Sequence, residues 1–427
     1  MKLSKEQIAS LNEPELKLHQ ARWNVLQDQL QEKGADVNGI LKQLDVFQIA
    51  IPSWALGTGG TRFGRFPMGG APLNLEEKMM DVGLLHALNR SSGSISLHIP
   101  WDIPDDAKGI RGLAAELDLR FDAVNSNTFQ DQPDQKLSYR YGSLCHTDKA
   151  VRDQAIAHNL EVVRYGVELG TRVLSVWLSD GSIFPGQHNM REALARTQDS
   201  LERIYKDMPA DWQMLIEYKP FEPAFYATVI PDWGTSFLLA NKVGERAKTL
   251  VDLGHHLPNT NIEQIVSTLL AEHKLGGFHF NDSKYADDDL TTGSIKPYQL
   301  FLIFYELVEG MRAQKRPMQD LGWMIDASHN IKDPLEDLLQ SVEAIKLAYS
   351  QALLVDDDKL HEAQQRNDPA MAQEILQDAF RTDLRPLLAE SRLRQGGALN
   401  PMAAYREAGV RKQLIGERGE KTVATGL

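Results

Sequence analysis

The sequence predicts an α/β protein whose centre is a (β/α)8 TIM barrel, with an N-terminal helical segment and a long C-terminal helical arm. Three observations predict this fold. Eight short runs of β-branched and other apolar residues recur along the chain, segments of helical periodicity separate them, and 427 residues suffice for one barrel with extensions. Such alternation is typical of a parallel sheet with crossover helices.

The predicted strands are these eight runs, taken in chain order. They cover residues 47–53, 95–101, 119–127, 172–180, 213–219, 247–255, 277–283 and 322–329. The clearest helices between them are predicted at residues 75–89, 150–169, 191–207, 261–273 and 298–312. Eight strands, each followed by a helix, make a (β/α)8 barrel.

The chain divides into three parts. Residues 1–44 are charged and helix-forming, and residues 45–332 hold the barrel. Residues 333–427 contain strong helical stretches at 334–354 and 370–380, with glycines at the breaks. We expect this last part to be an oligomerisation arm that packs on a neighbouring subunit.

Composition disfavours several classes of protein. The balance of 46 basic and 59 acidic residues, a net charge of −13, argues against nucleic acid as a partner. The sequence has no long apolar run, and it starts in a polar helix rather than an apolar signal core. A single cysteine, Cys145, fits a reducing compartment and leaves His and carboxylate side chains as metal ligands. We therefore expect a cytoplasmic protein without a membrane partner.

Polar residues end seven of the eight predicted strands, which is where a barrel carries its catalytic groups. Glu217 and Lys219 are two apart, so both can point inward. Asp252 and His255 are three apart and converge if Gly254 lets the chain turn. Strand ends with a purely structural role at the barrel rim would not need acidic and imidazole side chains.

The loop after the seventh strand adds two further acids. Asp287 and Asp289 have the spacing that presents two carboxylates to one cation, with Asp288 directed away. Of the adjacent His255 and His256, we expect only one to be a ligand. The candidate ligands form two sets that share Asp252: Glu217, Asp252, His279 and Asp326 for one divalent cation, and Asp252, His255, Asp287 and Asp289 for a second. Such shells suit Mn²⁺, Mg²⁺, Co²⁺ or Zn²⁺.

Each motif alone has an ordinary explanation, such as a surface ion pair, a helix cap or a solvated loop. Their joint occurrence at successive strand ends favours a metal site. Aromatic side chains lie at or just past the same ends, where they could pack on the apolar side of a sugar: Trp54, Trp101, Phe129 and Trp177. The glycine-rich residues 57–66 lack the Gly-Lys-Ser/Thr of a phosphate loop and fit a lid better.

These residues resemble the bacterial L-rhamnose isomerases that also act on other aldoses such as D-allose, within the xylose-isomerase-like TIM barrel superfamily. The resemblance covers nearly the whole chain. It rests on long motifs at residues 51–54, 57–63, 96–102, 125–129, 251–256, 279–285 and 324–326.

The resemblance implies a metal-dependent aldose–ketose isomerase with a monosaccharide substrate, two cations per subunit with Mn²⁺ the first choice, and a homotetramer. It places Lys219 beside the substrate carbonyl and His98 near the far hydroxyls. The expected catalytic residues are Lys219, Asp326 and His98, and the expected substrate contacts are Trp54, His98, Phe129, Trp177, Glu217 and Lys219. Tyr218 stands where the sibling pattern often has His, and we expect its side chain to face away from the pocket.

Two routes remain open for the reaction: a metal-assisted hydride shift from C2 to C1, or an enediol formed when a base such as Asp326 with bound water removes the C2 proton. The residues are compatible with L-rhamnose, L-mannose, L-lyxose, D-allose and D-ribose. The alternatives are a ketose 3-epimerase, a metal-dependent endonuclease and a catalytically silent binding protein. Asp287 and Asp289, as ligands of a second cation, argue against the epimerase. The net charge argues against the endonuclease, and the complete ligand set argues against the silent binding protein.

Overall fold

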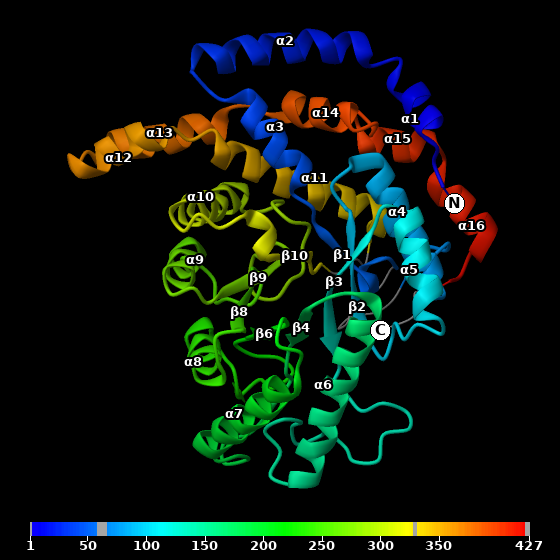
Figure 1. Cartoon of the computed structure of the whole chain (residues 1–427), viewed down its shortest axis with the longest axis vertical. Helices are drawn as coiled ribbons and strands as arrows, with labels where there is room; N and C mark the ends of the chain where they lie inside the picture. The colour runs from blue at the N-terminus through cyan, green and yellow to red at the C-terminus, as the bar shows by residue number, and fades with distance from the viewer. Residues whose placement is uncertain (1, 58–65, 328–330, 423–427) are drawn as a thin grey trace.

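The computed structural model describes residues 2–57, 66–327 and 331–422. Eight parallel strands close into a barrel in the order β1, β2, β3, β4, β6, β8, β9, β10, and helices surround it (Figure 1). The strands are β1 Ala50–Pro52, β2 Ser94–Ile99, β3 Arg120–Ser126, β4 Val173–Val176, β6 Gln213–Glu217, β8 Ala247–Asp252, β9 Leu275–Phe280 and β10 Gly322–Ile325. The predicted (β/α)8 barrel is confirmed. Residues 328–329 of the eighth predicted strand, and 58–65 of the predicted lid, lie outside the described residues.

A helix follows each barrel strand. These helices are α4 Leu75–Asn89, α5 Ala107–Glu116, α6 Lys149–Leu169, α7 Met190–Asp207, α8 Trp233–Val243, α9 Ile262–Ala271, α10 Pro297–Ala313 and α11 Pro334–Leu353. The five connecting helices specified from the sequence are all present. Helix α11 packs against α10 and α4, so it completes the ring, although the expected boundary at residue 332 groups it with the arm.

Side-chain caps explain where these helices begin. Seven of the eight start at an Asn or Asp whose side chain accepts a hydrogen bond from a first-turn backbone N–H, as Asn74 does from Glu77. The remaining helix, α10, starts at Pro297, a residue suited to the first helical position. A cap at that point satisfies donors that the helix itself cannot pair.

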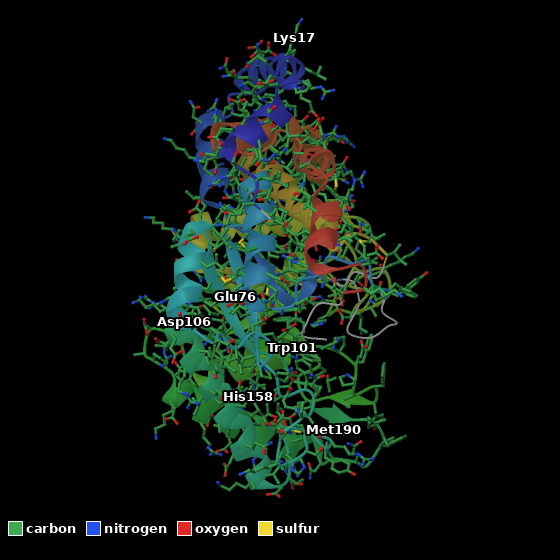
Figure 2. All side chains as sticks on the ribbon, turned by 90° about the vertical axis from the view of Figure 1, so that its right-hand side faces the viewer. Lys17, Glu76, Trp101, Asp106, His158 and Met190 are labelled. Carbon is green, nitrogen blue, oxygen red and sulfur yellow. The ribbon has the colours of Figure 1, made fainter. Side chains whose placement is uncertain are left out.

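The helices at the two ends of the chain form one layer beside the barrel. They are α1 Lys5–Asn12, α2 Leu16–Glu32 and α3 Val37–Val46, with α12 Asp357–Gln365, α13 Pro369–Arg381, α14 Arg385–Arg394, α15 Pro401–Glu407 and α16 Val410–Arg418. Helix α14 packs on α2 and α3, and the Asn12 carboxamide donates to Gly397 O and accepts from Leu399 N. Figure 2 shows Lys17 of α2 at one end of the long axis, with His158 and Met190 toward the other.

The core behind β9 fixes the direction of its histidine. Phe278 and Phe280 lie on either side of His279, and their rings stack on Trp323 at 5.6 and 6.0 Å between centroids. Phe280 also stacks on Phe304 of α10. Because neighbouring strand residues face opposite sides, His279 points into the barrel.

Two further strands join the loops on one side of the barrel mouth. Strands β5 Gly181–Ser182 and β7 Ala227–Thr228 pair in antiparallel fashion and link the loop after β4 to the loop after β6. In the described part of the chain, no helix combines the length and the apolar character that a membrane span needs.

Candidate active site

A cavity of about 370 Å³ lies at the carboxyl ends of the barrel strands. Pockets for small ligands commonly have about 300 to 1,000 Å³. Its walls include every side chain that the sequence predicts for the site except Asp252, which lies 1 % exposed behind them. The polar and aromatic lining residues are Trp54, His98, Trp101, Asn125, Ser126, Phe129, Gln130, Trp177, Ser179, Glu217, Lys219, Glu222, His255, His279, Asp287, Asp289 and Asp326.

A group of four potential ligands lies at one end of the cavity. Glu217, Asp252, His279 and Asp326 each bring one ligand atom within 4.8 Å of the others. His279 Nδ1 lies 3.3 Å from Glu217 Oε1, 3.7 Å from Asp252 Oδ2 and 3.6 Å from Asp326 Oδ2. The barrel explains this convergence, because Glu217 and Asp252 end β6 and β8, and His279 is the partner of Asp252 on β9. These are the four residues that the sequence groups around one cation.

A second group shares Asp252 with the first. Asp252, His255 and Asp287 bring their ligand atoms within 4.8 Å, and His255 Nε2 lies 3.5 Å from Asp287 Oδ1. Asp289 lines the same cavity but is not part of this close group, so three of the four residues predicted for a second cation come together. The chain turns at Leu253 and Gly254, as expected, and the His255 N–H donates to Asp252 O at 3.3 Å. Gly254 has no positive φ, and a Cβ there would lie 3.1 Å from an oxygen of Asp287, so the glycine also makes room for that carboxylate.

Burial and mutual charge strongly perturb these groups. Burial raises the pKa of Asp252 to about 7, and the charge of His255 opposes that shift. Burial disfavours protonated His279, but Glu217, Asp326 and Asp252 raise its pKa to about 9. The pKa of Glu217 lies well below its usual range, because His279 and His255 outweigh the effect of burial. Concentrated negative charge of this kind favours a bound cation.

The other end of the cavity is aromatic and centred on His98. The His98 ring lies 5.3 Å from Trp54, 4.3 Å from Trp101 and 5.5 Å from Phe129, between centroids. Phe129 in turn lies 4.8 Å from Trp177. Burial lowers the pKa of His98 to about 3, so this imidazole is neutral and can donate one hydrogen bond and accept another.

Lys219 joins the two ends. Its Nζ lies 2.5 Å from Asp287 Oδ2, 3.5 Å from Glu222 Oε2 and 5.3 Å from the centre of the Trp177 ring. The ammonium therefore lies between the acidic ligands and the aromatic wall, by which we mean Trp54, Trp101, Phe129 and Trp177 around His98. The backbone of Glu222 has a φ of +74°, an uncommon conformation for this residue type.

The residues next to the ligands point elsewhere, as the sequence predicts. The Tyr218 hydroxyl lies 2.7 Å from His256 Nε2, and both side chains are buried away from the cavity lining. The Asp288 carboxylate accepts from the backbone N–H groups of Lys284 and Tyr285. Its role in this loop is therefore to hold the backbone.

Several site residues were not identified from the sequence. Glu222 and Ser179 line the cavity, and Asn281 donates to Asp252 Oδ1 at 2.9 Å. Asn281 follows β9 by one residue, and Glu222 is three residues after Lys219, so position along the chain was the only available signal. Asp102, which follows the end of β2, does not line the cavity; its carboxylate accepts a hydrogen bond from the backbone N–H of His98.

This geometry agrees with the comparison to known proteins. Residues 92–323 match the xylose isomerase-like TIM barrel family. The chain belongs to that family. The xylose isomerase-like barrel described here is 50% identical over 398 residues to a protein of Rhizobium meliloti named "Probable sugar isomerase", covering 93% of this chain and 92% of the relative. It is 49% identical over 401 residues to a protein of the same name from Mesorhizobium japonicum, covering 94% and 93%.

Solved structures agree with the family fold. A structure of L-ribulose 3-epimerase superposes with a TM-score of 0.52 at 15% sequence identity, covering 76% of this chain and all of that one. At this identity the likeness concerns the fold of the xylose isomerase-like barrel alone.

Proposed function

We propose that this protein is a divalent-metal-dependent aldose–ketose isomerase that acts on a free monosaccharide, with L-rhamnose and L-rhamnulose as the first substrate pair to test and D-allose as another substrate. One observation carries the proposal: two ligand groups share Asp252 at one end of a cavity whose other end is aromatic, with Lys219 between them. The two relatives named as probable sugar isomerases support the reaction class.

The ligand groups fit a metal. The buried atoms Asp252 Oδ2, His255 Nδ1 and His279 Nδ1 make no hydrogen bond within the described part of the chain, although each belongs to a cluster of opposite charges. Glu217, Asp252, His279 and Asp326 would hold one cation, and Asp252, His255 and Asp287, with Asp289 as a further candidate, would hold a second. We propose Mn²⁺, with Co²⁺, Mg²⁺ and Zn²⁺ as alternatives. Such cations, when bound, polarise substrate oxygens and hold two of them side by side.

The chain's own residues divide the remaining work. The Lys219 ammonium donates to the substrate oxygen on which negative charge develops. Burial raises the pKa of Asp326, which keeps this carboxyl able to take up a proton at C2. His98 binds a far hydroxyl, while Glu217 contacts the oxygens near C2. Trp54, Phe129 and Trp177 pack on the apolar side of the sugar and exclude water.

Reaction in D₂O distinguishes the two chemical routes. Transfer of hydrogen directly from C2 to C1 leaves the product free of solvent deuterium. Abstraction of the C2 proton by Asp326 exchanges it with solvent, so deuterium appears at C1 of the product.

The function is tested by metal removal and restoration. EDTA treatment should abolish ketose formation from L-rhamnose, D-allose or D-xylose, and Mn²⁺ should restore it. Turnover of only another aldose would keep the isomerase and change the substrate. Because Asp289 lies outside the second ligand group, ketose 3-epimerisation is the second candidate function. C3 epimerisation without C1–C2 isomerisation would replace the proposal with that activity.

We further propose a cytoplasmic homotetramer. Exposed apolar side chains next to the β5–β7 pair support an interface, including Phe184 and Phe225, each 70% exposed. Light scattering should give four times the monomer mass of 47.9 kDa. A monomer in solution would contradict the assembly and leave the activity proposal unaffected.

A further inference from the structure

A buried ion pair lies beneath the aromatic end of the cavity. Lys78 Nζ of α4 lies 2.6 Å from Asp102 Oδ1, and the two side chains are 1% and 0% exposed. Neither residue lines the cavity. Because removing both charges from water costs free energy, a buried ion pair contributes little net stability to the fold. Stability alone therefore does not explain this pair.

The other carboxylate oxygen of Asp102 joins two strand ends. Asp102 Oδ2 accepts from Ser53 Oγ at 2.5 Å and from the backbone N–H of His98 at 2.8 Å. The Asp102 N–H donates back to His98 O at 2.9 Å. One carboxylate thus ties the turn after β1, the end of β2 and helix α4 together.

The tied segments carry the aromatic wall. Ser53 precedes Trp54, and Asp102 follows Trp101, so the bonds of Asp102 set the backbone on which Trp54, Trp101 and His98 stand. Trp54 Nε1 also donates to Asp326 Oδ1 at 3.0 Å. The position of the wall therefore depends on the turn that Asp102 holds, whereas the barrel itself holds the backbone of Asp326, whose N–H donates to Phe280 O at 2.9 Å.

We propose that Asp102, paired with Lys78, is a positioning residue that sets substrate affinity and specificity at the aromatic end of the site. The inference rests on the proposed isomerase function. Loss of the carboxylate releases Ser53 and the His98 backbone, so Trp54 and His98 lose their fixed spacing. The ligand group at the other end is built on β6, β8, β9 and the residue after β10, so the reacting carbons are less affected.

The test compares three variants with a control from the same helix. Asp102→Ala removes both carboxylate oxygens, and Lys78→Met removes the paired charge. Each should raise KM for L-rhamnose by about 10-fold, and the milder Ser53→Ala should raise it by about 3-fold. They should change kcat by less than about 3-fold and leave Mn²⁺ affinity unchanged. Asp81→Ala is the control, because Asp81 is also on α4 and forms a buried pair with Arg418 at 2.7 Å, away from the cavity. It should lower Tm without changing KM.

The outcomes separate the inference from the function on which it rests. An unchanged KM in Ser53→Ala and Asp102→Ala, or an equal change in Asp81→Ala, would overturn the positioning role. If Asp102→Ala does not fold, Ser53→Ala decides the question alone. If the wild-type protein turns over no aldose, the proposed function fails; the near-ultraviolet tryptophan signal must then still change in Ser53→Ala and not in Asp81→Ala, or the positioning role is also overturned.

Discussion

Asp252 is the residue on which both ligand groups depend. Its Oδ1 accepts from Gly254 N and Asn281 Nδ2, and its Oδ2 faces His279. Asp252→Asn should abolish activity and lower Mn²⁺ affinity at least about 10-fold, measured by equilibrium dialysis, because one ligand charge is lost from two sites. Asp288→Asn is the matched control in the adjacent loop, because Asp288 bonds backbone N–H groups that an amide oxygen can still serve. Near-normal turnover in a folded Asp252→Asn protein would contradict the site.

Lys219 should matter for the rate more than for binding. Removing one donor that stabilises a developing oxyanion typically costs about 10² to 10³ in kcat. Lys219→Ala should therefore lower kcat by about 10²-fold with a KM change below about 3-fold, measured by steady-state kinetics at saturating Mn²⁺. An unchanged kcat would remove this ammonium from the chemistry.

Buried His86 predicts acid sensitivity away from the site. Burial lowers the pKa of His86 to about 4 from an ordinary 6.5, so unfolding takes up a proton between these pH values. The stability that depends on neutral His86 is present above pH 6.5 and is lost as pH falls toward 4, by about 1.4 kcal/mol per pH unit. Urea unfolding from pH 7 to 4 should show a shallower loss in His86→Gln than in the wild type. Parallel curves would contradict this prediction.

At the residue scale, the sequence is most informative where chemistry and strand position coincide. Glu217, Asp252, His279 and Asp326 are recognisable because acids and imidazoles rarely end strands together. The positioning role proposed for Asp102 cannot be recognised in this way, because its partners Lys78 and Ser53 lie 24 and 49 residues away along the chain. Long-range pairs of this kind depend on how the elements pack.

At the scale of elements, the close contact between β9 and β10 depends on a glycine. A Cβ at Gly277 would lie 2.7 Å from the backbone oxygen of its partner Gly322, which has no side chain that could move away. Gly277→Ala should destabilise the protein by about 1 to 3 kcal/mol in urea unfolding. Gly112→Ala on exposed α5 is the control, because its Cβ meets nothing within 4 Å, and it should stabilise by about 1 kcal/mol. Equal effects of both changes would contradict the steric explanation.

Local sequence patterns predict where a helix or strand lies more reliably than they predict whether it belongs to the barrel or to the C-terminal arm. A strand or helix lies at each position named from the sequence, because apolar periodicity and Asn or Asp caps are local signals. The strand ends are predicted less accurately: β4 ends at Val176 and β8 at Asp252, whereas the predicted strands continue to residues 180 and 255. The sequence assigns α11 to the arm, whereas its contacts with α10 and α4 place it in the ring. Nothing local distinguishes a barrel helix from an arm helix when both are amphipathic.

At the scale of the whole molecule, metal binding should stabilise the fold. The ligands come from β6, β8, β9, the residue after β10 and the loop after β9, so a bound cation links elements that are separate in an unfolded chain. Mn²⁺ at about 100 times its Kd should add about 2.7 kcal/mol to the free energy of unfolding. Differential scanning calorimetry should show a higher Tm with Mn²⁺ than after EDTA, and no such rise in Asp252→Asn. A Tm that ignores Mn²⁺ in the wild type would contradict the metal centre.

The helical layer made by both ends of the chain has a consequence for biosynthesis. Asn12 pairs with the backbone of Gly397, 385 residues later, and Lys346 donates to the carbonyl oxygens of Leu44 and Phe47. At about 5 to 20 residues per second, the ribosome needs about 20 to 80 s to add these 385 residues. The first three helices therefore leave the ribosome long before their partners exist. Their apolar faces stay available to chaperones until α14 and the residues around Gly397 have been made, so the native layer cannot be completed earlier than that.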